Sequence, residues 1–179
     1  MNEKTKLFIR ETIESILIAL ILALAVRTFI VQAFKIPSGS MRPTLLEGDR
    51  ILVNKFLYRF KEPKRGDVIV FKYPEDPKRD FIKRLASKGS EEVFIRGGRI
   101  VVNGQEIASG VFGEHYYYNQ GPFGEEHKTQ KVPSGHYFVL GDNSASSRDS
   151  RFWGFVPRRN VLGKAFLIYW PLNRIRTIR

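Results

Sequence analysis

The sequence predicts a mainly β domain, built from many short strands, behind one N-terminal apolar helix. Residues 13–34 are mostly apolar, and short strand-like runs separated by Pro, Gly and charged residues follow them. A chain of 179 residues suits one domain with an appendage and is long enough to bury a core. The absence of cysteine excludes a disulfide scaffold, cysteine-ligated zinc and a thiol nucleophile.

The apolar segment at residues 13–34 has the length of a membrane-spanning helix. Its positions would reach about 33 Å, which is about one hydrocarbon thickness. Glu14, Arg27 and Gln32 interrupt it. Three interpretations remain open, namely an uncleaved membrane anchor, a cleaved secretory signal and a buried amphipathic helix. We favour the anchor because the apolar character continues beyond Arg27.

Basic residues near the N-terminus determine the expected orientation. Lys4, Lys6 and Arg10 lie within residues 1–12 and favour a short cytoplasmic N-terminus. Residues 35–179 would then form one β-domain on the extracytoplasmic face of the cytoplasmic membrane.

The remaining elements are expected from turn signals. Pro37 and Pro43 follow the apolar segment, so we expect the helix to end near Phe34. Gly-Gly at 97–98 and Asn-Gly at 103–104 predict two hairpins. Residues 109–131 show no clear hydrophobic period and are interpreted as an insertion or long loop. Residues 141–151 are interpreted as a polar loop. The expected strands are residues 50–54, 67–73, 81–85, 92–96, 99–102, 105–107, 135–140 and 162–169.

The chain is strongly basic. Its 30 Lys and Arg residues exceed its 18 Asp and Glu residues, so the formal net charge is +12, but no dense basic block appears. A solvated basic surface is the simplest interpretation, and attraction to anionic membrane lipids is the next. No helix-turn-helix, zinc-finger or RNA-binding pattern is present, so we expect no nucleic-acid partner. We expect a monomer.

Histidine chemistry has little support in the sequence. His115, His127 and His136 are far apart and show no metal-ligand spacing, so we expect no metal site and no cofactor. A Ser-His-Asp triad that uses His136 and Asp142 stays open, although no Gly-x-Ser-x-Gly motif supports it.

A serine-rich turn and a lysine on a strand offer a different nucleophile. Residues 37–44 (PSGSMRPT) read most simply as a turn, and strand alternation places Lys83 on the same face as Phe81 and Leu85. A lysine there is usually a snorkelling side chain. Desolvation that lowered its pKa to about 8 would cost roughly 3 kcal/mol and would leave a neutral amine able to deprotonate a serine.

Four short segments connect the sequence to a known family. They are residues 34–49 (FKIPSGSMRPTLLEGD), 65–73 (RGDVIVFKY), 80–85 (DFIKRL) and 141–157 (GDNSASSRDSRFWGFVP). In this order they resemble the boxes of the bacterial type I signal peptidases, or leader peptidases, which are membrane-bound serine proteases that remove signal peptides from exported preproteins. The resemblance implies a catalytic β-domain like that of the signal peptidases and the self-cleaving repressors.

The resemblance also implies roles for particular residues. Ser40 would be the nucleophile and Lys83 the general base, and the reaction would pass through an acyl-enzyme. Ser38 and the Ser40 backbone N–H would form the oxyanion hole. Ser147 would hydrogen-bond to the lysine amine and orient it.

Further residues would support this centre and bind substrate. Asp149 and Arg151 would form an ion pair that holds the loop. The substrate would add as a strand, with pockets for small side chains before the cut in an Ala-x-Ala-like site. The residues that match substrate-binding positions are Phe34, Ile36, Pro37, Ile51, Val70, Asp80 and Ile82.

The sequence departs from the family's pattern in two places. Residues 85–91 (LASKGSE) replace a Gly-Leu-Pro-Gly-Asp-like turn, and residues 144–146 (SAS) stand where Arg-Asp-Asn-like residues are common. Two alternative functions stay open. One is a self-cleaving-repressor-like Ser/Lys protease, which would need a DNA-binding N-terminal domain, and the other is a catalytically silent, membrane-anchored binding relative.

Overall fold

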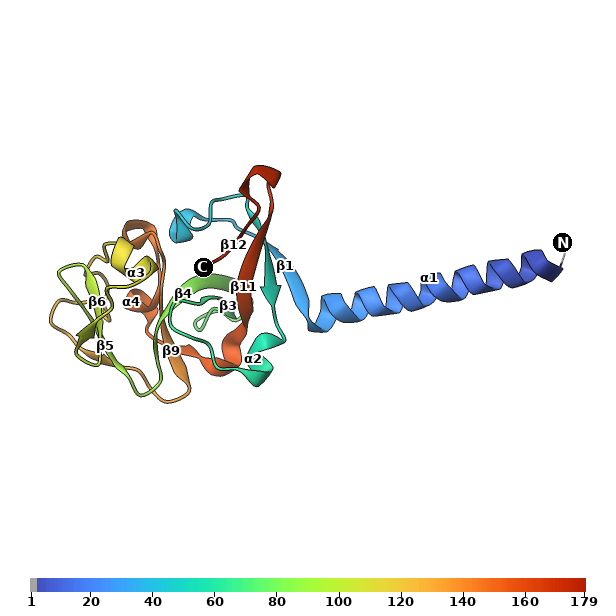
Figure 1. Ribbon diagram of the computed structural model, residues 1–179. Coiled ribbons are helices and arrows are strands. Elements are labelled where there is room, and N and C mark those ends of the chain that lie inside the picture. Colours follow the sequence, from blue (N-terminus) through green and yellow to red (C-terminus); the bar gives the residue numbers. More distant parts are fainter. Residues whose placement is uncertain (1–2) are drawn as a thin grey trace.

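The computed structural model describes residues 3–179, in which one long helix leads into a β-rich body (Figure 1). The helices are α1 (Glu3–Phe29), α2 (Leu57–Phe60), α3 (Val111–Glu114) and α4 (Ser150–Trp153). Single 3₁₀ turns are η1 (Gly39–Met41), η2 (Ser144–Ser146), η3 (Arg158–Asn160) and η4 (Leu172–Arg174). The strands are β1 (Val31–Lys35), β2 (Arg50–Asn54), β3 (Val68–Lys72), β4 (Asp80–Lys88), β5 (Glu92–Arg96), β6 (Arg99–Val102), β7 (Gln105–Glu106), β8 (Gln130–Lys131), β9 (His136–Leu140), β10 (Val156–Pro157), β11 (Val161–Trp170) and β12 (Arg176–Thr177).

The N-terminal helix differs from the one that the sequence predicts. α1 begins at Glu3, ends at Phe29 and projects from the β-rich body as a separate arm (Figure 1). The expected helix end near Phe34 is wrong, because residues 31–35 pair as β1 with β2. Among the residues that the structure describes, no helix combines the length and apolarity needed to cross a membrane, so the predicted spanning helix at residues 13–34 is not supported.

The larger sheet brings distant segments together. Its strands run in the order β1-β2-β11-β3-β4-β9-β10, with β12 paired to β11, and all these pairs are antiparallel. β1 and β4 are separated by three strands in this order. The turn that follows β1 nevertheless contacts β4 through Ser40 and Lys83, so the sheet curls back on itself.

The smaller sheet has the order β7-β6-β5-β8 and contains both predicted hairpins. Gly97 and Gly98 have φ values of 55° and 77°, and Asn103 and Gly104 have φ values of 50° and 78°. Two consecutive residues with positive φ form the type I′ turn that matches the twist of paired strands. The hairpin predictions are therefore confirmed.

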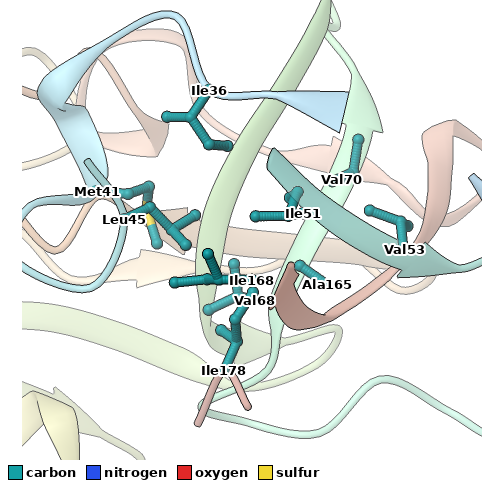
Figure 2. Close-up of a cluster of buried hydrophobic side chains, with 10 residues drawn as sticks. All are labelled: Ile36, Met41, Leu45, Ile51, Val53, Val68, Val70, Ala165, Ile168 and Ile178. Atoms are coloured by element: carbon teal, nitrogen blue, oxygen red, sulfur yellow. The ribbon is translucent and has the colours of Figure 1, made fainter. Parts of the chain in front are cut away.

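Three clusters of buried apolar side chains form the core, and the first lies inside the curl of the larger sheet. Strand alternation supplies Ile51 and Val53 from β2 and Val68 and Val70 from β3. Figure 2 shows its buried members, which are Ile36, Met41, Leu45, Ile51, Val53, Val68, Val70, Ala165, Ile168 and Ile178. This cluster underlies the turn that carries Ser40, because Met41 is completely buried in it.

The strand predictions fit most of the body. The expected strands at 50–54, 92–96 and 99–102 agree with β2, β5 and β6, whereas β11 is longer than expected at both ends. The segment at residues 109–131 is mostly irregular, as predicted, but it also contains α3 and β8.

Candidate active site

Ser40 lies in the turn η1, just after the edge strand β1. Ile36 and Met41, with exposed fractions of 3% and 0%, hold the two sides of this turn in the core. Ser40 itself is 7% exposed. Ser38 is exposed, and its Oγ lies 3.5 Å from Ser40 Oγ. The turn therefore presents two neighbouring hydroxyl groups.

Lys83 reaches the same point from β4. Its Nζ donates hydrogen bonds to Ser40 Oγ at 2.7 Å and to the Ile82 carbonyl oxygen at 2.9 Å. Burial lowers the pKa of Lys83 from the usual 10.5 to about 8, against the smaller raising effects of the Asp149 and Asp142 carboxylates. A lysine with such a pKa is partly a neutral amine near pH 8, and a neutral amine can accept a proton.

A cleft of about 620 Å³ opens onto Ser40 and Lys83. Arginine side chains line its rim, and Arg42 donates two hydrogen bonds to the Glu47 carboxylate at 2.8 and 2.9 Å. The full lining comprises Pro37, Ser38, Gly39, Ser40, Arg42, Glu47, Arg79, Asp80, Phe81, Ile82, Lys83, Asn143, Ser146 and Arg148.

The predicted substrate-binding residues divide into two groups. Pro37, Asp80 and Ile82 line the cleft. The other four, which are Phe34, Ile36, Ile51 and Val70, are not among its lining residues and pack in the first core cluster instead. Ile82 also packs against that cluster, so it links the cleft to the core.

The polar loop at residues 141–151 is tied to the turn that carries Ser40, where the Asn143 backbone N–H donates to the Ser40 carbonyl oxygen. Asp149 and Arg151 are completely buried, and Arg151 donates from Nε to Asp149 Oδ1 at 2.8 Å and from Nη2 to Oδ2 at 2.9 Å. Arg151 Nη2 also donates to the Ser147 carbonyl oxygen at 3.3 Å. The ion pair thus holds the backbone of the loop that carries Ser147.

The Ser147 hydroxyl is buried next to the nucleophile turn. It has no hydrogen-bond partner within the part of the chain that the structure describes, so the predicted contact with the Lys83 amine is not formed here. A Cβ atom at Gly141 would lie 2.1 Å from Ser147 Oγ and 2.5 Å from the Ser40 carbonyl oxygen. Only glycine at position 141 allows the loop and the nucleophile turn to come this close.

Asn143 is a site residue that sequence reasoning missed. Its backbone N–H donates to the Ser40 carbonyl oxygen at 3.1 Å, and its side-chain Nδ2 donates to the Gly39 carbonyl oxygen at 3.0 Å. These two bonds tie the loop directly to the nucleophile turn. Asn143 lies within residues 141–157, one of the four segments that resemble the family, but nothing in the sequence indicates that it would contact the turn at residues 39–40.

A second buried ion pair supports β4 next to Lys83. Arg84 donates from Nε and Nη2 to Asp142, each at 2.7 Å, and both side chains are at most 1% exposed. Thr44 Oγ1 donates to Asp142 Oδ2 at 2.5 Å. Through Thr44, Arg84 and Asp142, these bonds join the turn after Ser40, strand β4 and the loop at residues 141–151.

The histidine alternative is not formed. Asp142 bonds to Arg84 and Thr44, whereas the Nδ1 of His136 lies 2.9 Å from the Ser134 carbonyl oxygen. Within residues 3–179, no group of three His, Asp or Glu side chains is arranged to hold a metal ion.

Comparisons with known proteins identify the family of the chain. The family model described as signal peptidase, peptidase S26, matches residues 9–170. A signal peptidase I from Leptolyngbya laminosa is 42% identical, covering 92% of this chain and 81% of the relative. A signal peptidase I from Aquifex aeolicus is 36% identical, covering 90% of this chain and 84% of the relative. The crystal structure of a signal peptidase I from Enterococcus faecalis is 30% identical, with a TM-score of 0.49, covering 58% of this chain and 97% of that one. The chain therefore belongs to the signal peptidase family, peptidase S26, and is a serine endopeptidase that removes signal peptides.

Proposed function

We propose that this enzyme cleaves exported preproteins after Ala-x-Ala-like sites, with Ser40 as nucleophile and neutral Lys83 as general base. One observation carries the proposal, namely the 2.7 Å contact between Lys83 Nζ and Ser40 Oγ at the cleft. A nucleophile within hydrogen-bond reach of a base is the geometric signature of covalent catalysis. Both side chains are also largely removed from water, which favours the neutral amine.

The proton transfers follow from this contact. Neutral Lys83 takes the proton from Ser40 Oγ as the oxygen attacks the scissile carbonyl carbon. Ser38 Oγ, 3.5 Å from Ser40 Oγ, and the Ser40 backbone N–H donate to the oxyanion that develops. The Lys83 ammonium then returns the proton to the leaving amine as the peptide bond breaks. Water hydrolyses the acyl-enzyme with Lys83 again as base and regenerates Ser40.

Strand edges beside the cleft support substrate binding by strand addition. Among the strands of residues 3–179, β1 is an edge strand that pairs with β2 alone. In β4, residues 80–84 pair with β3, whereas the pairing with β9 covers only residues 84–88. Within the described structure, residues 80–83 therefore keep one strand edge that no other strand covers. An extended signal-peptide segment can hydrogen-bond to that edge and present small alternate side chains to Ile82.

A cleavage assay tests the proposal. Purified enzyme in detergent should cut a preprotein that carries an Ala-x-Ala site, and mass spectrometry of the products should place the cut after the second alanine. Ser40→Ala and Lys83→Ala should abolish cleavage. Near-full activity in either variant would show that the dyad assignment is wrong. A wild-type enzyme that binds the preprotein without cutting it would instead indicate a silent relative.

We further propose that α1 holds the catalytic domain at the cytoplasmic membrane, on its extracytoplasmic face, where exported preproteins emerge. Apolar side chains along α1 are exposed, such as Ile16, Ile18 and Leu22 at 59–63%. The net charge of +12 favours anionic lipid surfaces. Flotation with anionic and with zwitterionic vesicles tests the lipid preference, and equal recovery with both would contradict it. Protease accessibility in intact spheroplasts tests the face.

A further inference from the structure

The predicted insertion has a part that packs against the active-site loop. Residues 117–124, here called the buttress segment, lie between α3 and β8 in the sequence and on the α4 side of the body (Figure 1). The Phe123 backbone N–H donates to the Arg151 carbonyl oxygen at 2.9 Å. Arg151 Nη1 donates to the Tyr118 carbonyl oxygen at 2.9 Å. The segment thus holds Arg151 at both its backbone and its guanidinium group.

Two glycines allow this close approach. A Cβ atom at Gly121 would lie 2.4 Å from the Arg151 carbonyl oxygen, and one at Gly124 would lie 2.8 Å from Arg151 Cγ. Gly121 also has a φ of +69°, in the region that favours glycine. The buttress segment is therefore shaped to fit around Arg151.

Ser144 joins this segment to the loop. Its Oγ accepts a hydrogen bond from the Tyr118 backbone N–H and another from Arg151 Nη1, both at 2.8 Å. Its carbonyl oxygen accepts from Arg151 Nη2 at 2.8 Å. Ser144 is only 4% exposed, so these donors have little access to water that could replace the hydroxyl.

We propose that Ser144 and the buttress segment are positioning elements for the reaction, because they fix Arg151 and, through it, the Asp149 carboxylate, whose charge acts on Lys83. This inference rests on the proposed Ser40–Lys83 mechanism. Arg151 bonds to both Asp149 carboxylate oxygens and to the Ser147 carbonyl oxygen. Asp149 Oδ2 in turn accepts from the Gly141 backbone N–H at 3.0 Å. Removing the hydrogen bonds at Ser144, which does not itself line the cleft, lets these groups move away from the dyad.

Two variants test the contacts between the buttress segment, Ser144 and Arg151. Ser144→Ala removes the shared acceptor. Asn119→Ala loosens the buttress segment at a different point, because Asn119 Nδ2 donates to the Ile95 and Gly124 carbonyl oxygens, each at 3.1 Å. Ser109→Ala is the matched control, since Ser109 is exposed at the start of the insertion.

Both test variants should lower kcat by about tenfold to a hundredfold, as expected for a misplaced catalytic group, while KM stays within about twofold. The midpoint of the kcat–pH profile should also move to lower pH. The charged groups that act on Lys83 are Asp149 and Asp142, which raise its pKa, and Arg151, which lowers it. Of the two aspartates, Asp149 raises the pKa of Lys83 more. If Asp149 moves away, the ammonium form of Lys83 is stabilised less and its pKa falls. A purely structural role would lower the melting temperature without moving this midpoint.

The outcomes separate the inference from the proposed function. If the wild type cleaves the Ala-x-Ala preprotein and Ser40→Ala does not, the mechanism stands. The inference is then overturned if folded Ser144→Ala and Asn119→Ala keep wild-type kcat, or if kcat falls without a shift of the midpoint. If Ser144→Ala does not fold, Asn119→Ala, which replaces a half-buried side chain, decides by the same two criteria. A wild type that cannot cleave refutes the proposed function itself.

Discussion

Replacing Lys83 by methionine should abolish activity and make the protein more stable at neutral pH. Lys83 is 4% exposed and lies between the core and the cleft, so its ammonium form has little access to water. Methionine has a similar length and carries no charge that burial would penalise. The change therefore removes the cost of burying an ammonium group.

The magnitude follows from the pKa of Lys83. Burial lowers this pKa from the usual 10.5 to about 8, and at 1.36 kcal/mol per unit the cost to folding is about 3 kcal/mol at pH values below 8. Between pH 8 and 10.5 the unfolded chain holds this proton while the folded protein has released it. The folded state therefore gains stability as pH rises through this window, and above it the cost is gone.

The stability advantage of Lys83→Met should thus be about 3 kcal/mol larger at pH 7 than at pH 10.5. The loss of the two Lys83 hydrogen bonds is a nearly constant offset of about 1–3 kcal/mol, so the difference between the two pH values carries the information. Chemical denaturation in detergent, followed by tryptophan fluorescence, measures it. Lys88→Met, at the exposed end of the same strand, is the control. An advantage that is equal at both pH values would refute a buried lysine with a lowered pKa.

Three further predictions follow from the same contacts. The kcat should rise with pH through a midpoint near 8 as Lys83 loses its proton, and a profile that is flat from pH 6 to 10 would contradict a lysine base. Arg84→Met should destabilise the protein by about 3–5 kcal/mol because the Asp142 carboxylate is left buried without its ion-pair partner. In denaturation experiments, the double variant with Asp142→Leu should recover most of this loss. A loss under about 1 kcal/mol in the single variant would show that the pair is not buried in solution. Gly141→Ala should lower kcat by about a hundredfold or more, since its Cβ would displace Ser147 or the Ser40 carbonyl, and wild-type kcat in this variant would contradict the close approach.

Local signals in the sequence predicted the parts of the fold that depend on neighbouring residues. The hairpins at Gly97-Gly98 and Asn103-Gly104 require positive φ values, which these residues adopt at low cost. The strand expected at residues 50–54 likewise forms β2, in which Ile51 and Val53 are buried. In both cases the residues that decide the structure lie within a few positions of one another.

The strand β1 was missed because its sequence is as apolar as the helix before it. Residues 31–35 (VQAFK) continue the hydrophobic run of α1, and a short apolar run does not distinguish helix from strand. What decides is the pairing with β2, from Val31 opposite Asn54 to Lys35 opposite Arg50. That partner lies beyond two prolines and a turn, so no window on residues 13–34 contains it.

The supporting contacts of the candidate site were missed for a similar reason. Arg84 and Asp142 are 58 positions apart, and Asn143 lies 104 positions from the Gly39 carbonyl that it bonds. The type of residue at each position was visible in the sequence, but its partner depends on the curl of the larger sheet. Of the seven predicted substrate-binding residues, Ile36, Ile51 and Val70 lie in the first core cluster and Phe34 packs against it, and none of these four lines the cleft.

The two buried ion pairs explain how the pKa of a buried lysine can be lowered beside two aspartates. Alone, the buried carboxylates of Asp142 and Asp149 would favour the Lys83 ammonium strongly, and the amine would be a poor base near neutral pH. Arg84 and Arg151 each neutralise one of these carboxylates at 2.7–2.9 Å, so Lys83 faces two paired charges rather than two bare anions. Burial then outweighs the remaining attraction and lowers the pKa to about 8. The arginines therefore do more than hold the loop and β4 in place, because their charges offset those of the two aspartates, and the charge of Arg151 also lowers the pKa of Lys83, as the proposed general base requires.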